Sequence, residues 1–385
     1  MIRLICVVGA RPNFVKMAPL VQQIKEGWGD LFETTLVHTG QHYDQTLSKV
    51  FFDALRLPIP DVNLGVGSGS AARQIAEIMQ RFEEVILWKK PDQVLVVGDV
   101  NSTLATALAA EKVGVPVAHV EAGLRSFDRR MPEEMNRILT DQLSELLFAT
   151  EESAVQNLLN EGIGKERIFW VGNVMIDALI SHAQEAERST ILRQLNLAPQ
   201  GYALLTLHRP SNVDTQEGMH RIFALLSEVE KRIRVVFPVH PRTLGRMEEF
   251  DLMTSFRAMK NVTFCEPAGY LDFLRLMRDA KMVLTDSGGV QEETTALAIP
   301  CLTLRENTER PVTITQGTNL LTGTDPQRVL SAVIDIIEGR GKRGKVPALW
   351  DGQAALRIVQ VLQGHAGQGR RHPTALPLSA PAPFN

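Results

Sequence analysis

Two successive series of short apolar runs constrain the fold of this 385-residue chain more than any other feature. Each run is rich in Val, Ile and Leu, and longer segments with helical spacing of apolar residues separate neighbouring runs. This alternation predicts parallel sheets wound with helices, and two series predict two doubly wound, Rossmann-like α/β domains with a cleft between them. The expected strands are residues 4–8, 34–38, 94–97, 115–120 and 146–148, then 203–207, 235–239, 262–264, 282–284 and 300–304.

The joint between the series falls near Gly172-Asn173. We therefore expect a first domain at residues 1–172, a second at 173–350 and a final helix at 351–363. Residues 364–385 are rich in Gly, Pro and Ala without periodicity, and this composition predicts a disordered tail.

Composition excludes several classes of partner. A formal net charge of -3 gives no reason to expect nucleic acid or an anionic membrane. Cys6, Cys265 and Cys301 lie in or beside apolar runs, without the spacing of a disulfide framework or a metal site. The apolar N-terminus is too short for a signal peptide or a membrane span, so we expect a cytoplasmic protein.

The glycine-rich segments do not match a known nucleotide-binding loop. The segment at 65–70 has no third glycine at dinucleotide-loop spacing, and the segment at 339–343 has neither the upstream glycine nor the hydroxyl residue of a Walker loop. The sequence thus indicates neither NAD nor ATP, and no His, Cys and carboxylate cluster requires a metal. We expect no cofactor.

The stretch from Met282 to Arg310 predicts a phosphate site. A buried strand leads into Ser287, Gly288 and Gly289 and then into a helix, so free backbone amides and a hydroxyl can donate to anionic oxygens. Arg310 follows the next strand and can return toward this turn. Glu292 and Glu293 suit either sugar hydroxyls or helix capping, and a plain βαβ connection is the alternative for the whole stretch.

Polar residues also follow strands of the first series. Arg11 and Lys16 place two cations at a helix start, which indicates an anion there, or else a salt bridge to a carboxylate. Asp99 follows a strand and could be a helix cap. Glu121 ends an apolar strand, where a carboxylate is costly unless it is paired or functional.

Three further residues complete this set. Glu133 begins a helix, and together with Asp99 and Glu121 it suits acid/base chemistry, although capping by Glu133 and pairing of Glu121 with Arg125 are alternatives. His208 and Arg209 end a strand of the second series at the same expected sheet edge as Ser287.

Eight motifs occur in order, spread from residue 9 to about 365: GARPNFVKMAPL, GDVNST, HVEAGLRS, PEEMNR, TLHRPSN, PVHPR, TDSGGVQEE and TERP. With these motifs the chain resembles the non-hydrolysing UDP-N-acetylglucosamine 2-epimerases. The resemblance implies a glycosyltransferase-B-like fold, a homodimer, and a final helix that crosses back to the first domain. It also implies that the second domain holds UDP while the sugar faces the first.

The resemblance also implies roles for individual residues. The matching catalytic residues are Asp99, Glu121, Glu133 and His208. The matching substrate-binding residues are Arg11, Lys16, Arg209, Phe273, Ser287, Gly288, Gly289, Glu293 and Arg310. A looser match at Gln41, His42 and His240 implies regulation by a second substrate molecule.

The implied reaction is reversible epimerisation at C2 of UDP-N-acetylglucosamine, through elimination of UDP to a 2-acetamidoglucal and re-addition. Residues 267–269 are Pro-Ala-Gly where many members have Gln, Val312 follows TERP where many have Glu, and HRPSN replaces a more basic run. These departures leave a UDP-diacetamido-uronate as an alternative substrate. A glycosyltransferase and a non-catalytic sensor are alternatives from other classes, and nothing in the sequence indicates an acceptor site.

Overall fold

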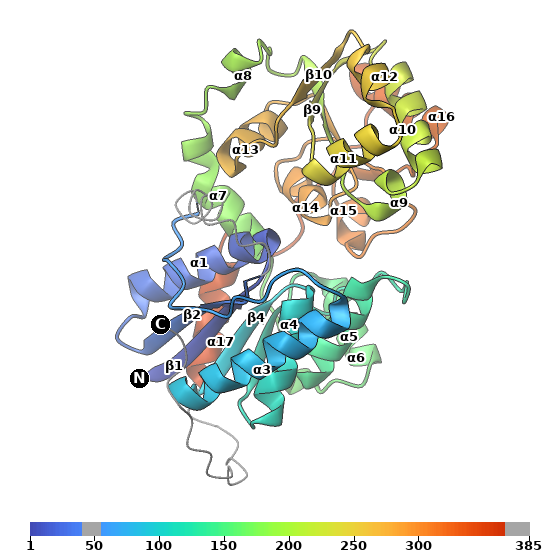
Figure 1. Cartoon of the computed structure of the whole chain (residues 1–385). Helices are drawn as coiled ribbons and strands as arrows, with labels where there is room; N and C mark the ends of the chain where they lie inside the picture. The colour runs from blue at the N-terminus through green and yellow to red at the C-terminus, as the bar shows by residue number, and fades with distance from the viewer. Residues whose placement is uncertain (41–54, 366–385) are drawn as a thin grey trace. The chain divides into compact units, whose positions relative to one another are not determined.

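The computed structural model describes residues 1–40 and 55–365, and its chain divides into two compact units (Figure 1). The first unit consists of Met1–Ala178 together with the chain from Ala348 onward, and the second of Leu179–Pro347. The predicted tail at 364–385 lies outside the described residues from 366 onward.

The first unit is built on a seven-stranded parallel sheet with the strand order β3-β2-β1-β4-β5-β6-β7. Its central strands are almost entirely buried, as expected when helices cover both faces of a parallel sheet. The strands are β1 (Ile2–Val8), β2 (Phe32–His38), β3 (Val62–Asn63), β4 (Gln93–Val97), β5 (Val117–Ala122), β6 (Leu146–Ala149) and β7 (Ile168–Trp170).

Helices connect these strands, and the last described helix, α17 (Ala354–His365), packs against α1 (Arg11–Gly27) within this unit. Its buried residues, among them Ala354, Ala355, Ile358 and Leu362, recur at helical spacing and form one apolar face. The helices are α1 (Arg11–Gly27), α3 (Ala71–Lys89), α4 (Asn101–Lys112), α5 (Pro132–Leu143), α6 (Glu152–Asn160), η1 (Lys165–Arg167) and α17 (Ala354–His365). Helix α7 (Val174–Ala186) begins in this unit and ends in the second.

The second unit repeats the same design with a six-stranded parallel sheet of order β10-β9-β8-β11-β12-β13. Its strands are β8 (Tyr202–Thr206), β9 (Arg234–Pro238), β10 (Val262–Cys265), β11 (Met282–Thr285), β12 (Cys301–Thr303) and β13 (Asn319–Leu321). Its helices are α8 (Ile191–Gln194), α9 (Pro210–Val213), α10 (Gln216–Val229), α11 (Pro241–Glu249), α12 (Met253–Arg257), α13 (Tyr270–Arg278), α14 (Gly288–Ala296), α15 (Pro311–Thr315) and α16 (Pro326–Ile337). Among the residues described in the two units, no helix has the length and apolar character needed to cross a membrane.

Both sheets confirm the predicted doubly wound α/β class. In each sheet the strand order reverses once, between β1 and β4 in the first unit and between β8 and β11 in the second. Open α/β sheets bind ligands at the carboxyl ends of the strands beside such a reversal. The residues that follow these four strands are therefore the first place to look for a site.

Candidate active site

Two of the predicted carboxylates leave adjacent strands of the first unit. Asp99 follows β4 directly after Gly98, and Glu121 lies near the end of β5. The pairing of β5 with β6 shifts register between Val120 and Ala122, and Glu121 itself has a φ of 75°. A left-handed conformation is costly for a residue with a side chain, and a bulge of this kind turns a side chain out of the regular pleat. The strand end is thus shaped around Glu121.

Glu121 forms a buried ion pair with Lys16 of α1. Only 4% of Glu121 and 6% of Lys16 is exposed, so both charges are almost fully withdrawn from water. The salt-bridge alternative for Lys16 is confirmed. The proposed pairing of Glu121 with Arg125 is wrong, because Arg125 pairs with Asp141 and Glu161, at 2.7 Å each.

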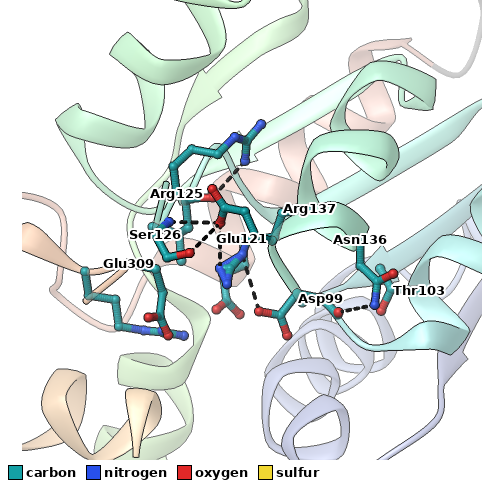
Figure 2. Close-up of polar contacts among 12 residues, drawn as sticks. Asp99, Thr103, Glu121, Arg125, Ser126, Asn136, Arg137 and Glu309 are labelled. Atoms are coloured by element: carbon teal, nitrogen blue, oxygen red, sulfur yellow. Dashed lines mark hydrogen bonds and ion pairs between the residues drawn. The ribbon is translucent and has the colours of Figure 1, made fainter. Parts of the chain in front are cut away.

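The backbone carbonyl of Asp99 accepts a hydrogen bond, and a cation lies near its carboxylate (Figure 2). The amide of Asn136 donates to the Asp99 carbonyl at 2.9 Å, and Nε of Arg137 lies 3.6 Å from Oδ2 of Asp99. The cap of α4 is Val100, without a side-chain cap bond, so the capping alternative for Asp99 is wrong. The Asp99 carboxylate is left partly exposed at the strand end.

Arg137 was not singled out from the sequence, although it ends the PEEMNR motif. It is 2% exposed, and none of its three guanidinium nitrogens has a hydrogen-bond partner. The guanidinium lies between Asp99 and Glu134, whose Oε2 is 3.5 Å from Nη1. A buried guanidinium without hydrogen bonds is costly, so it calls for an explanation in function.

Glu133 and Glu134 have different surroundings in the first turn of α5. Glu134 is buried and accepts hydrogen bonds from the Ser126 amide at 2.9 Å, the Ser126 hydroxyl at 3.0 Å and the Phe127 amide at 2.9 Å. Glu133 is exposed, and the cap of α5 is Met131. Glu134 therefore has a structural role that the sequence analysis did not assign to it, and Glu133 remains accessible.

In the second unit, Asp286 organises the ends of β8 and β11. This buried carboxylate accepts from the backbone amides of His208 and Arg209 and from the Asn212 amide, at 3.0 to 3.2 Å. Nδ1 of His208 lies 3.2 Å from Oδ1 of Asp286. Burial alone would raise the pKa of Asp286, but these hydrogen bonds and the nearby His208 lower it. The His208 side chain is 42% exposed, so its other ring nitrogen is free to face a ligand.

The predicted phosphate turn does open a helix. Ser287 caps α14 without a side-chain cap bond, and its own amide donates to the Thr285 hydroxyl at 2.9 Å. A Cβ on Gly288 would come within 2.5 Å of Nη1 of Arg310. Glycine at 288 therefore makes room for the Arg310 guanidinium, in addition to any ligand. Gly289 follows in the first turn of α14.

Arg310 is placed beneath this turn by two buried carboxylates. Its Nε lies 2.8 Å from Oε1 of Glu292, and its Nη1 pairs with Glu309. Arg305 and Arg209 also pair with Glu309, at 2.7 and 3.4 Å. Burial by itself would raise the pKa of Glu309, but these arginines lower it well below its usual range. Glu292 therefore pairs with Arg310, and the capping alternative for it is wrong.

Glu293 is a further buried carboxyl group at this turn, and its surroundings change its pKa strongly. It is 5% exposed, and burial together with the neighbouring charge of Glu292 raises its pKa to about 8. Tyr270, at the start of α13, has a buried hydroxyl without a hydrogen-bond partner. Burial and the charge of Glu293 raise the pKa of this hydroxyl. Phe273 lies on the same helix, half-buried against the apolar core.

The remaining predicted residues are less well defined. His240 caps α11 by accepting from the Arg242 amide at 3.2 Å, and its ring centroid is 5.8 Å from that of His208. Gln41, His42 and the side chain of Arg11 lie outside the described part of the chain. Among the side chains that the structure describes, no group of three or more His, Cys, Asp or Glu residues could hold a metal ion.

Comparison with known proteins gives a consistent result. Residues 29–363 match the family described as UDP-N-acetylglucosamine 2-epimerase. The UDP-N-acetylglucosamine 2-epimerase of Methanocaldococcus jannaschii is 42% identical over 367 residues, which cover 94% of this chain and 98% of that protein. The UDP-2,3-diacetamido-2,3-dideoxy-D-glucuronate 2-epimerase of Pseudomonas aeruginosa is 39% identical over 364 residues, 94% of this chain and 99% of that protein.

A solved structure extends the similarity to three dimensions. The crystal structure of Methanocaldococcus jannaschii UDP-GlcNAc 2-epimerase in complex with UDP-GlcNAc and UDP matches with a TM-score of 0.87 and 41% identity. The match covers 94% of this chain and all of the other.

Proposed function

Because the chain belongs to the UDP-N-acetylglucosamine 2-epimerase family, we propose that it interconverts UDP-N-acetylglucosamine and UDP-N-acetylmannosamine by inverting C2. The family that the eight sequence motifs indicated is thereby confirmed. The observation that carries the proposal is the 42% identity to an enzyme named for this activity, over nearly the full length of both chains. The polar residues that follow the strands at the two reversals of strand order are consistent with this activity.

The proposed route is elimination followed by re-addition. The hydrogen on C2 has no adjacent carbonyl group to acidify it, so simple deprotonation is too difficult. Loss of that proton together with cleavage of the bond between C1 and the UDP oxygen gives 2-acetamidoglucal and UDP. Re-addition of UDP at C1, with a proton delivered to the other face of C2, gives the epimer. The main task is then to stabilise the charge that develops on the departing diphosphate.

We propose that residues of the second unit perform that task. The free amides at the start of α14, the Ser287 hydroxyl and Arg310 would bind the diphosphate, since a helix N-terminus and a guanidinium both favour anions. Arg209 would add charge. His208, oriented by Asp286, would donate to the departing oxygen.

The other substrate contacts in this unit would hold the nucleoside. Glu293 would bind the ribose hydroxyls, and Phe273 would lie near the uracil. The buried, raised-pKa carboxyl of Glu293 supports its assignment, because such groups are costly unless they serve a ligand.

We propose that the first unit supplies the proton chemistry. Asp99, Glu121 and Glu133 would remove and return the proton at C2, with Lys16 contacting the sugar. The strained backbone of Glu121 and the accessible carboxylates of Asp99 and Glu133 support this assignment. Arg11 is proposed as a further cation for the diphosphate, and Gln41, His42 and His240 as regulatory residues.

A second substrate is supported by the Pseudomonas aeruginosa relative, which is named for a diacetamido-uronate epimerase and is only slightly less similar at 39% identity. The changed residues at 267–269 and at Val312 fall in the second unit. Epimerisation of that sugar nucleotide is therefore the alternative. We also propose a homodimer in the cytoplasm.

The test is proton NMR of the purified protein with UDP-N-acetylglucosamine in D2O. We expect UDP-N-acetylmannosamine to appear with deuterium at C2, without any acceptor molecule. A UDP-2,3-diacetamido-2,3-dideoxyglucuronate is assayed in parallel, and faster turnover of it would assign the alternative substrate. Binding of both sugar nucleotides without turnover of either would contradict the epimerase proposal.

A further inference from the structure

A completely buried histidine ties together the two strand ends that bear Asp99 and Glu121. His119 lies on β5, two residues before Glu121, and pairs in register with Val96 of β4. Its Nε2 is 2.8 Å from the carbonyl oxygen of Gly98, and its Nδ1 is 2.7 Å from Oδ1 of Asp141. The activity proposed above gives no role to His119.

Both ring nitrogens of His119 face hydrogen-bond acceptors. A carbonyl oxygen can only accept, and Asp141 is an acceptor as long as it is ionised. Its second oxygen accepts from the Gly123 amide at 3.1 Å and pairs with Arg125 at 2.7 Å. Burial would raise the pKa of Asp141, but His119 and Arg125 lower it. Asp141 therefore acts as an acceptor, and because the Gly98 carbonyl can only accept, Nε2 of His119 is the donor in its hydrogen bond to Gly98.

The Gly98 peptide is fixed from both sides by β5. Its amide donates to the carbonyl of Val120 at 3.0 Å, and its carbonyl accepts from His119. Gly98 has a φ of 69°, so the chain turns there before Asp99. Without the His119 bond, this turn would keep only its amide contact to β5, and the direction in which Asp99 leaves β4 would be less restricted.

The same hydrogen bond fixes one carboxylate relative to the other. Asp99 is the residue directly after Gly98. Glu121 lies two residues after His119 on β5, the strand to which Gly98 is hydrogen-bonded. Chemistry at C2 needs both carboxylates in defined positions on the sugar, and a misplacement of about 1 Å costs about 10²-fold in rate.

We infer that His119 is a positioning residue that sets the spacing of Asp99 and Glu121 through its hydrogen bond to the Gly98 carbonyl. This inference rests on the proposed function, because it takes Asp99 and Glu121 as catalytic. His119 itself is completely buried. Asp141 holds its orientation, and Arg125 pairs with both Asp141 and Glu161.

Two substitutions of His119 separate its two hydrogen bonds. The amide nitrogen of Gln reaches about as far as Nε2 and can still donate to Gly98, whereas that of Asn reaches only as far as Nδ1 and keeps the bond to Asp141. We expect His119→Asn to lower kcat about 100-fold and His119→Gln less than tenfold. KM for UDP-N-acetylglucosamine is expected to stay within about twofold in both, because UDP is assigned to the second unit. Equal loss of kcat in the two variants would overturn the inference.

Two further measurements keep the result decisive. Nitrogen-15 NMR of the wild-type protein should show Nε2 of His119 protonated, even if neither variant folds. A ring without a proton on Nε2 would overturn the inference, because it could not donate to the Gly98 carbonyl. Asp99→Asn serves as the reference: full activity in that variant would contradict the catalytic assignment of Asp99, which is a failure of the proposed function and not of the role of His119.

Discussion

Arg137 lies 3.6 Å from Asp99 without donating a hydrogen bond to it, although its guanidinium is buried. The same guanidinium is 3.5 Å from Glu134, which holds the backbone of Ser126 and Phe127. Arg137 thus links the loop before α5 to a proposed catalytic carboxylate. Its guanidinium makes no hydrogen bond that would offset the cost of burial, so we expect Arg137 to contribute more to catalysis than to stability.

We predict that Arg137→Met separates these two contributions. Activity should fall by about 100-fold or more, because Asp99 loses the cation beside it. The free energy of unfolding should fall by only about 1 kcal/mol, because Glu134 loses the cation near it but keeps its hydrogen bonds from Ser126 and Phe127. Kinetics and urea unfolding check both parts. Arg130→Met, at an exposed arginine near the same loop, is the matched control and should leave both quantities unchanged. A large loss of stability with normal kcat would contradict this view of Arg137.

The buried pair of Lys16 and Glu121 gives a second prediction. Glu121→Gln should abolish turnover while UDP still binds, and it should destabilise the fold by about 3 kcal/mol because Lys16 loses its carboxylate partner. Adding Lys16→Met to Glu121→Gln should restore much of the stability without restoring activity. Thermal unfolding of the single and double variants measures the coupling. Near-normal turnover in Glu121→Gln would remove Glu121 from the catalytic residues.

The sequence predicted the fold well where apolar runs were long. The strands that it did not predict are β3, β7 and β13, which have two or three residues each, too few for a periodic pattern. Trp170 in β7 is also well exposed, so that strand lacks a buried run.

At the site, the sequence identified residue types but not their pairings. Glu121 and Lys16 are 105 positions apart, and only the parallel sheet brings them together. For the same reason the role of Asp286 was missed: its donors come from the turn after β8 and from α9, far away in sequence. Glu133 and Glu134 are neighbours of one type, and only the direction of the α5 helix decides which is buried.

A third prediction concerns His208 and its orienting carboxylate. Asp286→Asn should lower kcat about 100-fold. The donors of His208, Arg209 and Asn212 now share two carboxylate oxygens, whereas the amide of Asn would offer them only one acceptor oxygen. If Asp286 acts through His208, the double variant Asp286→Asn/His208→Asn should be no slower than His208→Asn alone. Steady-state kinetics of the three variants decides this. Additive losses would mean that Asp286 affects kcat independently of His208. Because His208 is half-exposed, His208→Asn itself should fold normally.

The last prediction follows from the raised pKa of Glu293, about 8 in the folded protein against an ordinary value of 4.5. A carboxyl group that holds its proton more tightly when folded stabilises the fold at low pH, and this stabilisation is lost as the pH rises from about 4.5 through 8. The free energy of unfolding of the wild type, relative to Glu293→Gln, should therefore fall by about 1 kcal/mol per pH unit in that range. Urea unfolding at several pH values measures it.

Ligand binding should follow the opposite course if Glu293 accepts hydrogen bonds from the ribose. Those bonds favour the carboxylate, so UDP should bind the wild type more tightly as the pH rises from 6 to 8, relative to Glu293→Gln under the same conditions. Calorimetry should also show a proton released on binding at pH 7, because Glu293 is mostly protonated there in the free protein. Glu248→Gln, at an exposed glutamate of the same unit, should show wild-type behaviour. Tighter binding at low pH would instead mean that the protonated carboxyl group donates to the ribose.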